Sequence, residues 1–192
     1  MGRWEPNTRE RLARAALELF GERGYEQTTV AEIARRAGLT ERTYFRHYAD
    51  KREVLFGGSE VLQKVFTTAV AEAPPSAAPI DVVAAGLEAV AAVFPEREHS
   101  RQRQSVVGSH PELQERELIK LATLCAAVTE ALRARGVPDP AAALAAEAGI
   151  AVFKIGYERW IAPAEQRELA DLLRESLTEL KAVTAGSHAL PW

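Results

Sequence analysis

The chain of 192 residues is 47% hydrophobic and 27% charged, a composition that permits a buried core and argues against a disordered or fibrous protein. Its net charge of −3 at pH 7 argues against a DNA packager that relies on phosphate neutralisation alone. No apolar run approaches the roughly 20 residues needed to span a bilayer, and the first residues lack the apolar segment of a secretion signal. We therefore expect a cytoplasmic protein with no membrane partner.

Side chains that commonly carry catalysis form no recognisable motif. There is no nucleophile–base pair, P-loop, dinucleotide-binding glycine motif or metal-ligand spacing, so the sequence predicts neither an enzyme nor a metal or other cofactor. The one cysteine, Cys125, cannot form an intrachain disulfide and lies in a helical pattern, where a small core residue is expected.

Charge is distributed unevenly along the chain. Residues 1–52 hold 11 Lys and Arg against 8 Asp and Glu, a net of +3, whereas the other residues hold 13 against 19, a net of −6. This modest asymmetry points to a basic module beside an acidic one.

In nearly every segment, apolar residues recur at intervals of three or four residues, which is the period of an amphipathic helix. No convincing strand pattern occurs. The first helix is predicted after Pro6, with Asn7 as its cap, and ends at Gly24. A second helix begins at Thr29, which forms a capping-box pair with Glu32.

The second helix stops at Gly38, and Thr40 caps a third short helix, ERTYFRHY. Two short helices joined by a turn of three or four residues that contains glycine form the helix-turn-helix pattern.

A longer helix is predicted over about residues 51–72, opened by Asp50 with Glu53. Its Gly57-Gly58 pair costs about 2 kcal/mol relative to two alanines, so either the helix bends there or Ser59 restarts it. Five more helices are predicted beyond the Pro-rich loop. Their approximate ranges are 80–94, 96–109, 111–135, 140–161 and 164–184.

The run TTVAEIARRAGLTERTYFRHYADKREVL, residues 28–55, closely resembles the DNA-binding signature of the tetracycline-repressor (TetR) family. It combines the helix lengths, caps, turn glycine and His-aromatic-x-x-Lys ending in one register. The resemblance implies an all-α protein of about nine helices. A helix-turn-helix DNA-binding domain would take residues 1–50, and a helical ligand-binding and dimerisation domain would take residues 51–192.

The same resemblance implies a regulator of transcription. We expect a repressor that binds a palindromic operator in double-stranded DNA as a homodimer, and that leaves it when a small apolar or amphipathic effector binds the C-terminal domain. A ligand-independent regulator, or an activator, is the alternative.

The third helix carries the candidates for base recognition. Tyr44 and Tyr48 are four residues apart and are predicted to pack inward, whereas Arg42 and Arg46 form a second face. An arginine near the start of such a helix can bind guanine O6 and N7 with two hydrogen bonds, so we expect Arg42 to contact a base. Thr43, beside it, suits a thymine methyl group or a phosphate.

Contacts to phosphate are predicted at both ends of the motif. His47 and Lys51 occupy positions where the resemblance implies contacts to the DNA backbone. Thr29 and Thr40, as helix caps, could present hydroxyl and N–H groups to a phosphate. The alternative is that these two threonines only cap their helices.

Two positions depart from the family pattern. Arg42 stands where a small residue is common, which indicates an operator sequence of its own. Phe45 stands where a phosphate-binding tyrosine is common, and it cannot donate a hydrogen bond. We therefore expect Phe45 to touch sugar or methyl groups.

Two stripes mark the C-terminal half. Small residues recur at spacings of four, three and four residues in the predicted helix 140–161, and leucines repeat along the last helix. The resemblance implies that these helices pair with their copies in a four-helix bundle; the alternative is an ordinary intramolecular core. The residues are Ala145, Gly149, Val152, Gly156, Leu169, Leu173, Leu177 and Leu180.

Aromatic residues on a neighbouring face of the same helix are candidates for an apolar effector pocket, although a plain core would explain them as well. Arg101, with Arg103, His99 and His110, offers anchors for an anionic ligand or forms a solvated face. The candidate lining residues are Phe66, Phe94, Arg101, Phe153, Tyr157 and Trp160.

Overall fold

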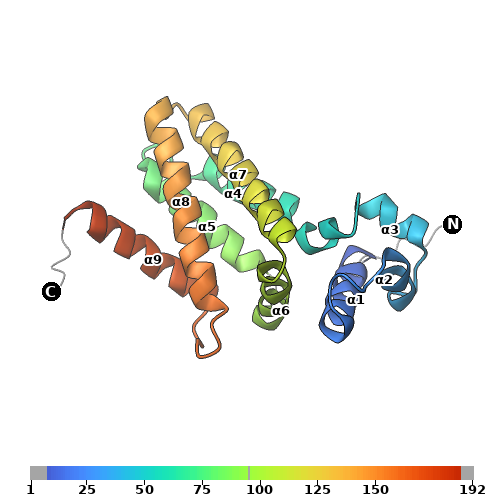
Figure 1. The fold of residues 1–192 in the computed structure, drawn as a ribbon. Helices are drawn as coiled ribbons and strands as arrows, with labels where there is room; N and C mark the ends of the chain where they lie inside the picture. The colour runs from blue at the N-terminus through green and yellow to red at the C-terminus, as the bar shows by residue number, and fades with distance from the viewer. Residues whose placement is uncertain (1–7, 95, 187–192) are drawn as a thin grey trace. The chain divides into compact units, whose positions relative to one another are not determined.

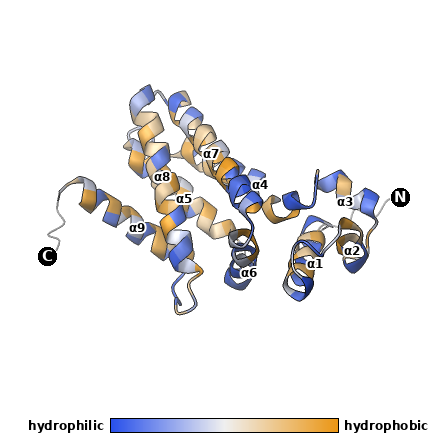
Figure 2. Ribbon diagram, in the orientation of Figure 1, coloured by the Kyte–Doolittle hydropathy of each residue, from blue (hydrophilic) through white to orange (hydrophobic). Residues whose placement is uncertain are grey.

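The computed structural model describes residues 8–94 and 96–186. Within these residues the regular structure consists of nine α-helices and one short 3₁₀ helix, without any strand (Figure 1). The predicted all-α class is confirmed. In Figure 2 the labelled helices carry both hydrophobic and hydrophilic residues, as expected for helices that cover a shared core. The predicted cap Asn7 lies outside the described residues.

The first three helices follow the predicted pattern. Helix α1 spans Thr8–Arg23, α2 spans Val30–Arg36 and α3 spans Glu41–His47. The chain leaves α1 through Gly24 at φ 85°, in the left-handed region that favours glycine. The apolar side chains predicted to anchor α1 are all buried. They are Leu12, Ala16, Leu19 and Phe20.

The predicted single helix that follows is divided in two. A 3₁₀ helix spans Arg52–Phe56, with the N–H of Arg52 donating to the Asp50 carboxylate at 2.8 Å, and a new α-helix, α4, spans Ser59–Glu72. A Cβ atom at Gly57 would lie 2.8 Å from the Tyr48 ring, so the chain needs glycine where it passes this ring. Of the two possibilities left open by the sequence, the restart at serine is the one observed.

Five further helices complete the described chain. They are α5 (Pro79–Val93), α6 (Arg97–Gly108), α7 (Pro111–Ala134), α8 (Asp139–Trp160) and α9 (Leu169–Thr184). The last helix begins five residues later than predicted, because the Glu165 carboxylate accepts the N–H groups of Gln166 and Arg167, both at 2.9 Å, and so stabilises a turn. None of the described helices is long and apolar enough to cross a membrane.

The chain forms two compact units whose boundaries differ from the predicted domains 1–50 and 51–192. We call Met1–Gly58 with His99–Leu118 the head unit, and Ser59–Glu98 with Ile119–Trp192 the body unit. The 3₁₀ helix, most of α6 and the start of α7 belong to the head because they share its core. The buried residues that they add to this core are Val54, Leu55, Phe56, Val107 and Leu113.

The body unit is built around α5 and α8. Helix α4 packs on α5, and α8 packs on both α5 and α9. The ring of Phe66 occupies the space that a side chain at Gly86 would need, so this glycine permits close contact between α4 and α5. In α8, a Cβ atom at Gly149 would lie 2.5 Å from Val83, so glycine at this position also permits close contact between α8 and α5.

Candidate nucleic-acid interface and ligand cleft

A tight turn joins α2 to α3. Gly38 has φ 68°, its N–H donates to the carbonyl of Arg35 at 3.0 Å, and the N–H of Leu39 donates to the carbonyl of Ala34 at 2.8 Å. This closure at the end of α2 is the left-handed glycine cap that the sequence predicted. Thr40 then caps α3 by accepting the N–H of Thr43 at 3.2 Å.

Two tyrosines fix α3 on the head. Tyr44 and Tyr48 are buried, as predicted. The Tyr44 hydroxyl donates to the carbonyl oxygens of Asp50 at 3.2 Å and Lys51 at 3.3 Å, and the Tyr48 hydroxyl donates to that of Arg9 at 3.2 Å. Burial is the main reason why the pKa of Tyr48 is raised. One face of α3 therefore packs against the rest of the head, and the opposite face is available to contact a binding partner.

The opposite face of α3 presents two cations and a phenyl ring. Arg42 and Arg46 are exposed, and neither pairs with a carboxylate of the described residues. The Phe45 side chain is 53% exposed although it is large and apolar, and its ring meets that of Tyr44 edge-on, with the centroids 5.6 Å apart. Guanidinium groups suit guanine edges and phosphates, and a phenyl ring suits thymine methyl groups. The specific base contacts of these residues stay predictions.

His47 closes the same helix in a half-buried position. Its Nε2 is buried and has no hydrogen-bond partner among the described residues. Burial first, and then the positive charges of Arg46 and Arg9, lower the pKa of the imidazole below its ordinary value. An anion that reached Nε2 would satisfy this atom and favour its protonation, which is compatible with the predicted phosphate contact.

The start of α2 is capped internally. Thr29 Oγ1 accepts the N–H of Glu32 at 3.3 Å, while the Glu32 carboxylate accepts the N–H and hydroxyl of Thr29, both at 2.9 Å. The backbone N–H of Thr29 is the main reason why the pKa of Glu32 is lowered. The predicted capping box is confirmed, whereas a phosphate contact by Thr29 stays a prediction.

Lys51 has a structural role that the sequence did not reveal. Its Nζ donates to the carbonyl oxygens of Tyr25 at 2.9 Å and Thr28 at 3.2 Å, and lies 4.1 Å from the centroid of the Tyr25 ring. Two of the three ammonium donors are thus used inside the head. A phosphate contact by Lys51 would depend on the third.

Side chains of α7 and of the turn that leads into it also hold the head together. The rings of Tyr25 and His110 lie 4.9 Å apart, and Arg116 donates to the Glu53 carboxylate at 2.6 Å. His110 was predicted only as a possible anchor for an anionic ligand, and Arg116 was not singled out, since the partners of both lie 63 or more residues away in the chain.

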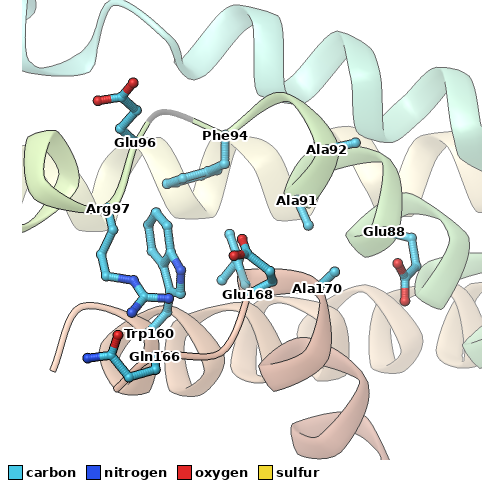
Figure 3. A pocket seen from close by; sticks show the side chains of 11 residues that line it. Glu88, Ala91, Ala92, Phe94, Glu96, Arg97, Trp160, Gln166, Glu168 and Ala170 are labelled. Atoms are coloured by element: carbon cyan, nitrogen blue, oxygen red, sulfur yellow. The ribbon is translucent and has the colours of Figure 1, made fainter. Parts of the chain in front are cut away.

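The body unit contains an open cleft of about 670 Å³ (Figure 3). It lies between the end of α5, the start of α6, the end of α8 and the loop that leads into α9. Its size falls in the usual range for drug-sized ligands. The lining residues are Glu88, Ala91, Ala92, Phe94, Glu96, Arg97, Trp160, Gln166, Glu168, Leu169 and Ala170.

The predicted pocket residues are only partly gathered at this cleft. Phe94 and Trp160 line it. Phe153 and Tyr157 are not lining residues, but their rings contact that of Phe94, with centroids 5.8 and 5.6 Å from the Phe94 centroid. Phe66 does not line it, because its ring fills the contact between α4 and α5.

Arg101 is also absent from the lining and belongs to the head unit. The polar residues of the lining, which no sequence pattern indicated, are Glu88, Glu96, Arg97, Gln166 and Glu168. The break between α5 and α6 and the loop after α8 were the only signals that could have marked this region.

The predicted dimer-contact residues lie inside the chain. In α8 a Cβ atom at Gly156 would be 2.6 Å from Leu173 of α9, and Gly149 faces Val83 of α5. The side chains of Ala145, Val152, Leu169, Leu173 and Leu177 are buried, and Leu180 packs partly buried against the same core. These stripes pack in the core of one chain, which agrees with the alternative interpretation, and a dimer contact through them stays a prediction.

Comparison with known proteins gives the two parts of the chain separate matches. Residues 12–56 match the profile of the bacterial regulatory proteins of the tetR family, and residues 77–185 match that of the MftR C-terminal domain. The HTH-type transcriptional regulator TcmR of Streptomyces glaucescens is 39% identical over 83 residues, which cover 43% of this chain and 37% of TcmR. Curated relatives are matched over 29% to 37% of their own lengths.

Solved structures share the fold across nearly the whole chain. A TetR-family regulator from Syntrophomonas wolfei has a TM-score of 0.65 and 18% identity, with 95% of this chain and 97% of the other covered. The regulator FadR of Bacillus subtilis, solved in complex with stearoyl-CoA, has a TM-score of 0.60 and 19% identity, with 93% and 99% covered. With the tetR signature on the helix-turn-helix and a C-terminal match that spans more than half of the sequence, the chain belongs to the TetR family of DNA-binding transcriptional regulators.

Proposed function

We propose that this regulator is a repressor that occupies a palindromic operator as a homodimer and is released when a small molecule fills the cleft of the body unit. It would act in the cytoplasm, where the bacterial chromosome lies. One observation carries the effector response. Arg97 lines the cleft and is the first residue of α6, whereas residues 99–108 of that helix belong to the head unit.

The coupling follows from this shared helix. Arg97 donates to the carbonyl oxygens of Glu165 and Arg167 in the loop after α8, so a ligand that displaces the loop also acts on the start of α6. Farther along α6, Val107 is buried in the core of the head. To shift the protein from 99% DNA-competent to 1%, a ligand must prefer the non-binding arrangement by about 5.5 kcal/mol.

Exposed apolar side chains on α8 support the dimer. Leu144, Ala148, Ala151 and Ile155 are spaced by four, three and four, and so lie along one side of the helix, where all are exposed except the half-buried Ala148. The side chains of Leu144 and Ile155 are 71% and 53% exposed. A palindromic operator needs a twofold protein, and we assign this stripe to contact with a second copy.

The proposed DNA contacts are of two kinds: contacts to base edges, which determine sequence preference, and contacts to phosphates, which contribute affinity. Arg42 and Phe45 would meet base edges in the major groove, with the arginine on a guanine and the phenyl ring on a thymine methyl group. Arg46 and His47 would meet phosphates. Thr29, Thr40, Thr43 and Lys51 remain candidate phosphate contacts.

The test begins with an operator selected from random-sequence DNA by the purified full chain. Fluorescence anisotropy should give a dissociation constant at least about 10³-fold lower for the selected site than for random DNA, with two chains bound per palindrome. Addition of a ligand shown to occupy the cleft should then weaken binding. Arg97→Met should bind the operator normally and respond less to that ligand.

Other results would redirect the proposal. Operator affinity that is unchanged by a saturating cleft ligand would indicate a ligand-independent regulator. Affinity that rises would indicate a regulator that binds DNA together with its ligand. Equal affinity for selected and random DNA would remove the sequence-specific function altogether.

A further inference from the structure

The cleft of the body unit has an excess of negative charge. Its lining carboxylates belong to Glu88, Glu96 and Glu168, and its lining guanidinium belongs to Arg97. Glu88 pairs with Arg174 at 2.6 Å. Glu96 and Glu168 are exposed and pair with no cationic side chain of the described residues. Such a lining attracts a positive charge and repels a negative one.

The one lining cation is already engaged. Arg97 donates through both terminal nitrogens to the carbonyl oxygens of Glu165 and Arg167, and its Cζ lies 5.5 Å from the centroid of the Trp160 ring. Because these donors hold the loop after α8, an anionic ligand would have to compete with backbone carbonyls for Arg97. The geometry therefore disfavours a carboxylate or phosphate ligand.

Trp160, one of the lining residues, has an unused hydrogen-bond donor. The residue is only 5% exposed, and its indole N–H is buried with no acceptor among the described residues. Tryptophan N–H groups usually find a partner when they are buried. A bound molecule with an oxygen or nitrogen acceptor would supply the missing partner.

Two aromatic rings border the same space. The rings of Phe94 and Trp160 lie edge-to-face, with their centroids 5.8 Å apart and an angle of 86° between their planes. In Figure 3 the indole lies between Phe94 and the loop that carries Gln166 and Glu168. Aromatic faces of this kind bind flat rings and attract organic cations.

We propose that the effector is an aromatic organic cation that carries a hydrogen-bond acceptor. Its ring system packs against Phe94 and Trp160, its positive charge faces Glu96 and Glu168, and its acceptor takes the Trp160 N–H. This inference rests on the proposed function of the cleft as the effector site, and it adds the chemical class of the ligand.

Two dyes of one ring system test the charge. Rhodamine 6G is a cationic xanthene with ether and ester oxygens, and fluorescein is its anionic counterpart. Titration of each dye with the full chain, followed by fluorescence anisotropy in the absence of DNA, should give a dissociation constant about tenfold lower for rhodamine 6G. The preference should diminish as salt is added, because the carboxylates are exposed.

Three variants assign the binding to the cleft. Glu168→Gln and Glu96→Gln should each weaken rhodamine binding severalfold and leave fluorescein binding unchanged or stronger. Trp160→Phe keeps a ring and removes the donor, so it should weaken rhodamine binding as well. Glu72→Gln, an exposed substitution on α4 outside the lining, is the matched control and should change neither. Circular dichroism checks that every variant keeps its helices.

The outcomes separate this inference from the function on which it rests. Equal affinity for the two dyes, preference for fluorescein, or binding of neither would overturn the cationic class. Tighter binding of stearoyl-CoA than of rhodamine 6G, weakened by the substitution Arg97→Met, would overturn it in favour of an anionic ligand. If rhodamine 6G binds with the expected pattern but operator affinity does not fall, the ligand class is upheld. The proposal that the ligand releases the protein from its operator is then wrong.

Discussion

Arg103 of α6 donates its Nε–H to the carbonyl oxygen of Leu55, 48 residues earlier in the chain, at 2.8 Å. The same guanidinium donates to the Glu117 carboxylate at 2.8 Å and lies 5.0 Å from the centroid of the Phe56 ring. One side chain thus joins α6, the start of α7 and the 3₁₀ helix that follows the DNA-binding motif. These contacts explain why a segment far along the sequence belongs to the head unit.

Replacement of Arg103 by methionine should lower the free energy of unfolding by about 1–3 kcal/mol. Methionine keeps much of the apolar stem, so the loss reports the bonds to the Leu55 carbonyl and the half-buried Glu117 carboxylate. Urea unfolding followed by circular dichroism measures it. Arg133→Met is the control, because Arg133 pairs with Glu130 and Asp139 on an exposed surface and should matter little. Equal effects of the two substitutions would contradict the structural role of Arg103.

Local features of the head could be predicted because their determinants lie within a few residues. Thr29 caps the start of α2 by a reciprocal pair of hydrogen bonds with Glu32, three residues later in the chain. Gly38, two residues after the last residue of α2, ends the helix with a positive φ angle. Tyr44 and Tyr48 face inward because they share one side of a helix whose ends were already defined. Helix period and capping chemistry were sufficient for these features.

Features that depend on distant partners could not be predicted. Lys51 binds carbonyls 23 and 26 residues away, so its sequence neighbours do not reveal the contact. Gly149 and Gly156 were correctly identified as places of close approach, but a one-dimensional pattern does not say whether the approaching helix comes from the same chain. The cleft brings Glu88 together with Glu168, which no local pattern connects.

Substitution Arg42→Ala should reduce discrimination at one base pair in each half-site by about 1–3 kcal/mol. A guanidinium that binds guanine with two hydrogen bonds contributes mainly to sequence preference. Anisotropy titrations against the selected operator and single-base variants measure the loss. Arg36→Ala removes the same charge from α2, where the guanidinium pairs with Glu22 at 2.8 Å, and should leave discrimination intact. Equal weakening on operator and random DNA would instead make Arg42 a phosphate contact.

We expect the exposed ring of Phe45 to contact the methyl group of a thymine in the operator. Replacing the contacted thymine by deoxyuridine removes one methyl group, which should weaken wild-type binding by about 0.8 kcal/mol, or about fourfold. Phe45→Ala should bind both DNAs alike, because it lacks the ring that meets the methyl group. Scanning every thymine of the operator in this way identifies the position. If no deoxyuridine substitution weakens binding, the exposed ring contacts sugars or only packs on Tyr44.

His47 predicts a pH dependence of DNA binding. Its pKa is held below the ordinary value in the free protein, so a phosphate at Nε2 would raise it and the complex would take up a proton. Operator affinity should therefore increase as the pH falls from 7.5 and level off below the pKa of the free protein. The free protein itself should lose stability over the same range, because the unfolded chain binds the proton more readily. His47→Gln should remove both effects; an unchanged pH profile would assign them to other groups.

The exposed stripe on α8 predicts how dimerisation can be broken. Ile155→Glu should convert a dimer into a monomer, because a second copy of the same helix would have to bury two unpaired carboxylates. Sedimentation velocity measures the change, and operator affinity should fall with it, since each chain then holds only a half-site. Val61→Glu on α4 is the matched control, because Val61 is 54% exposed and Ile155 is 53% exposed. A dimer that survives Ile155→Glu and dissociates with Val61→Glu would move the interface from α8 to α4.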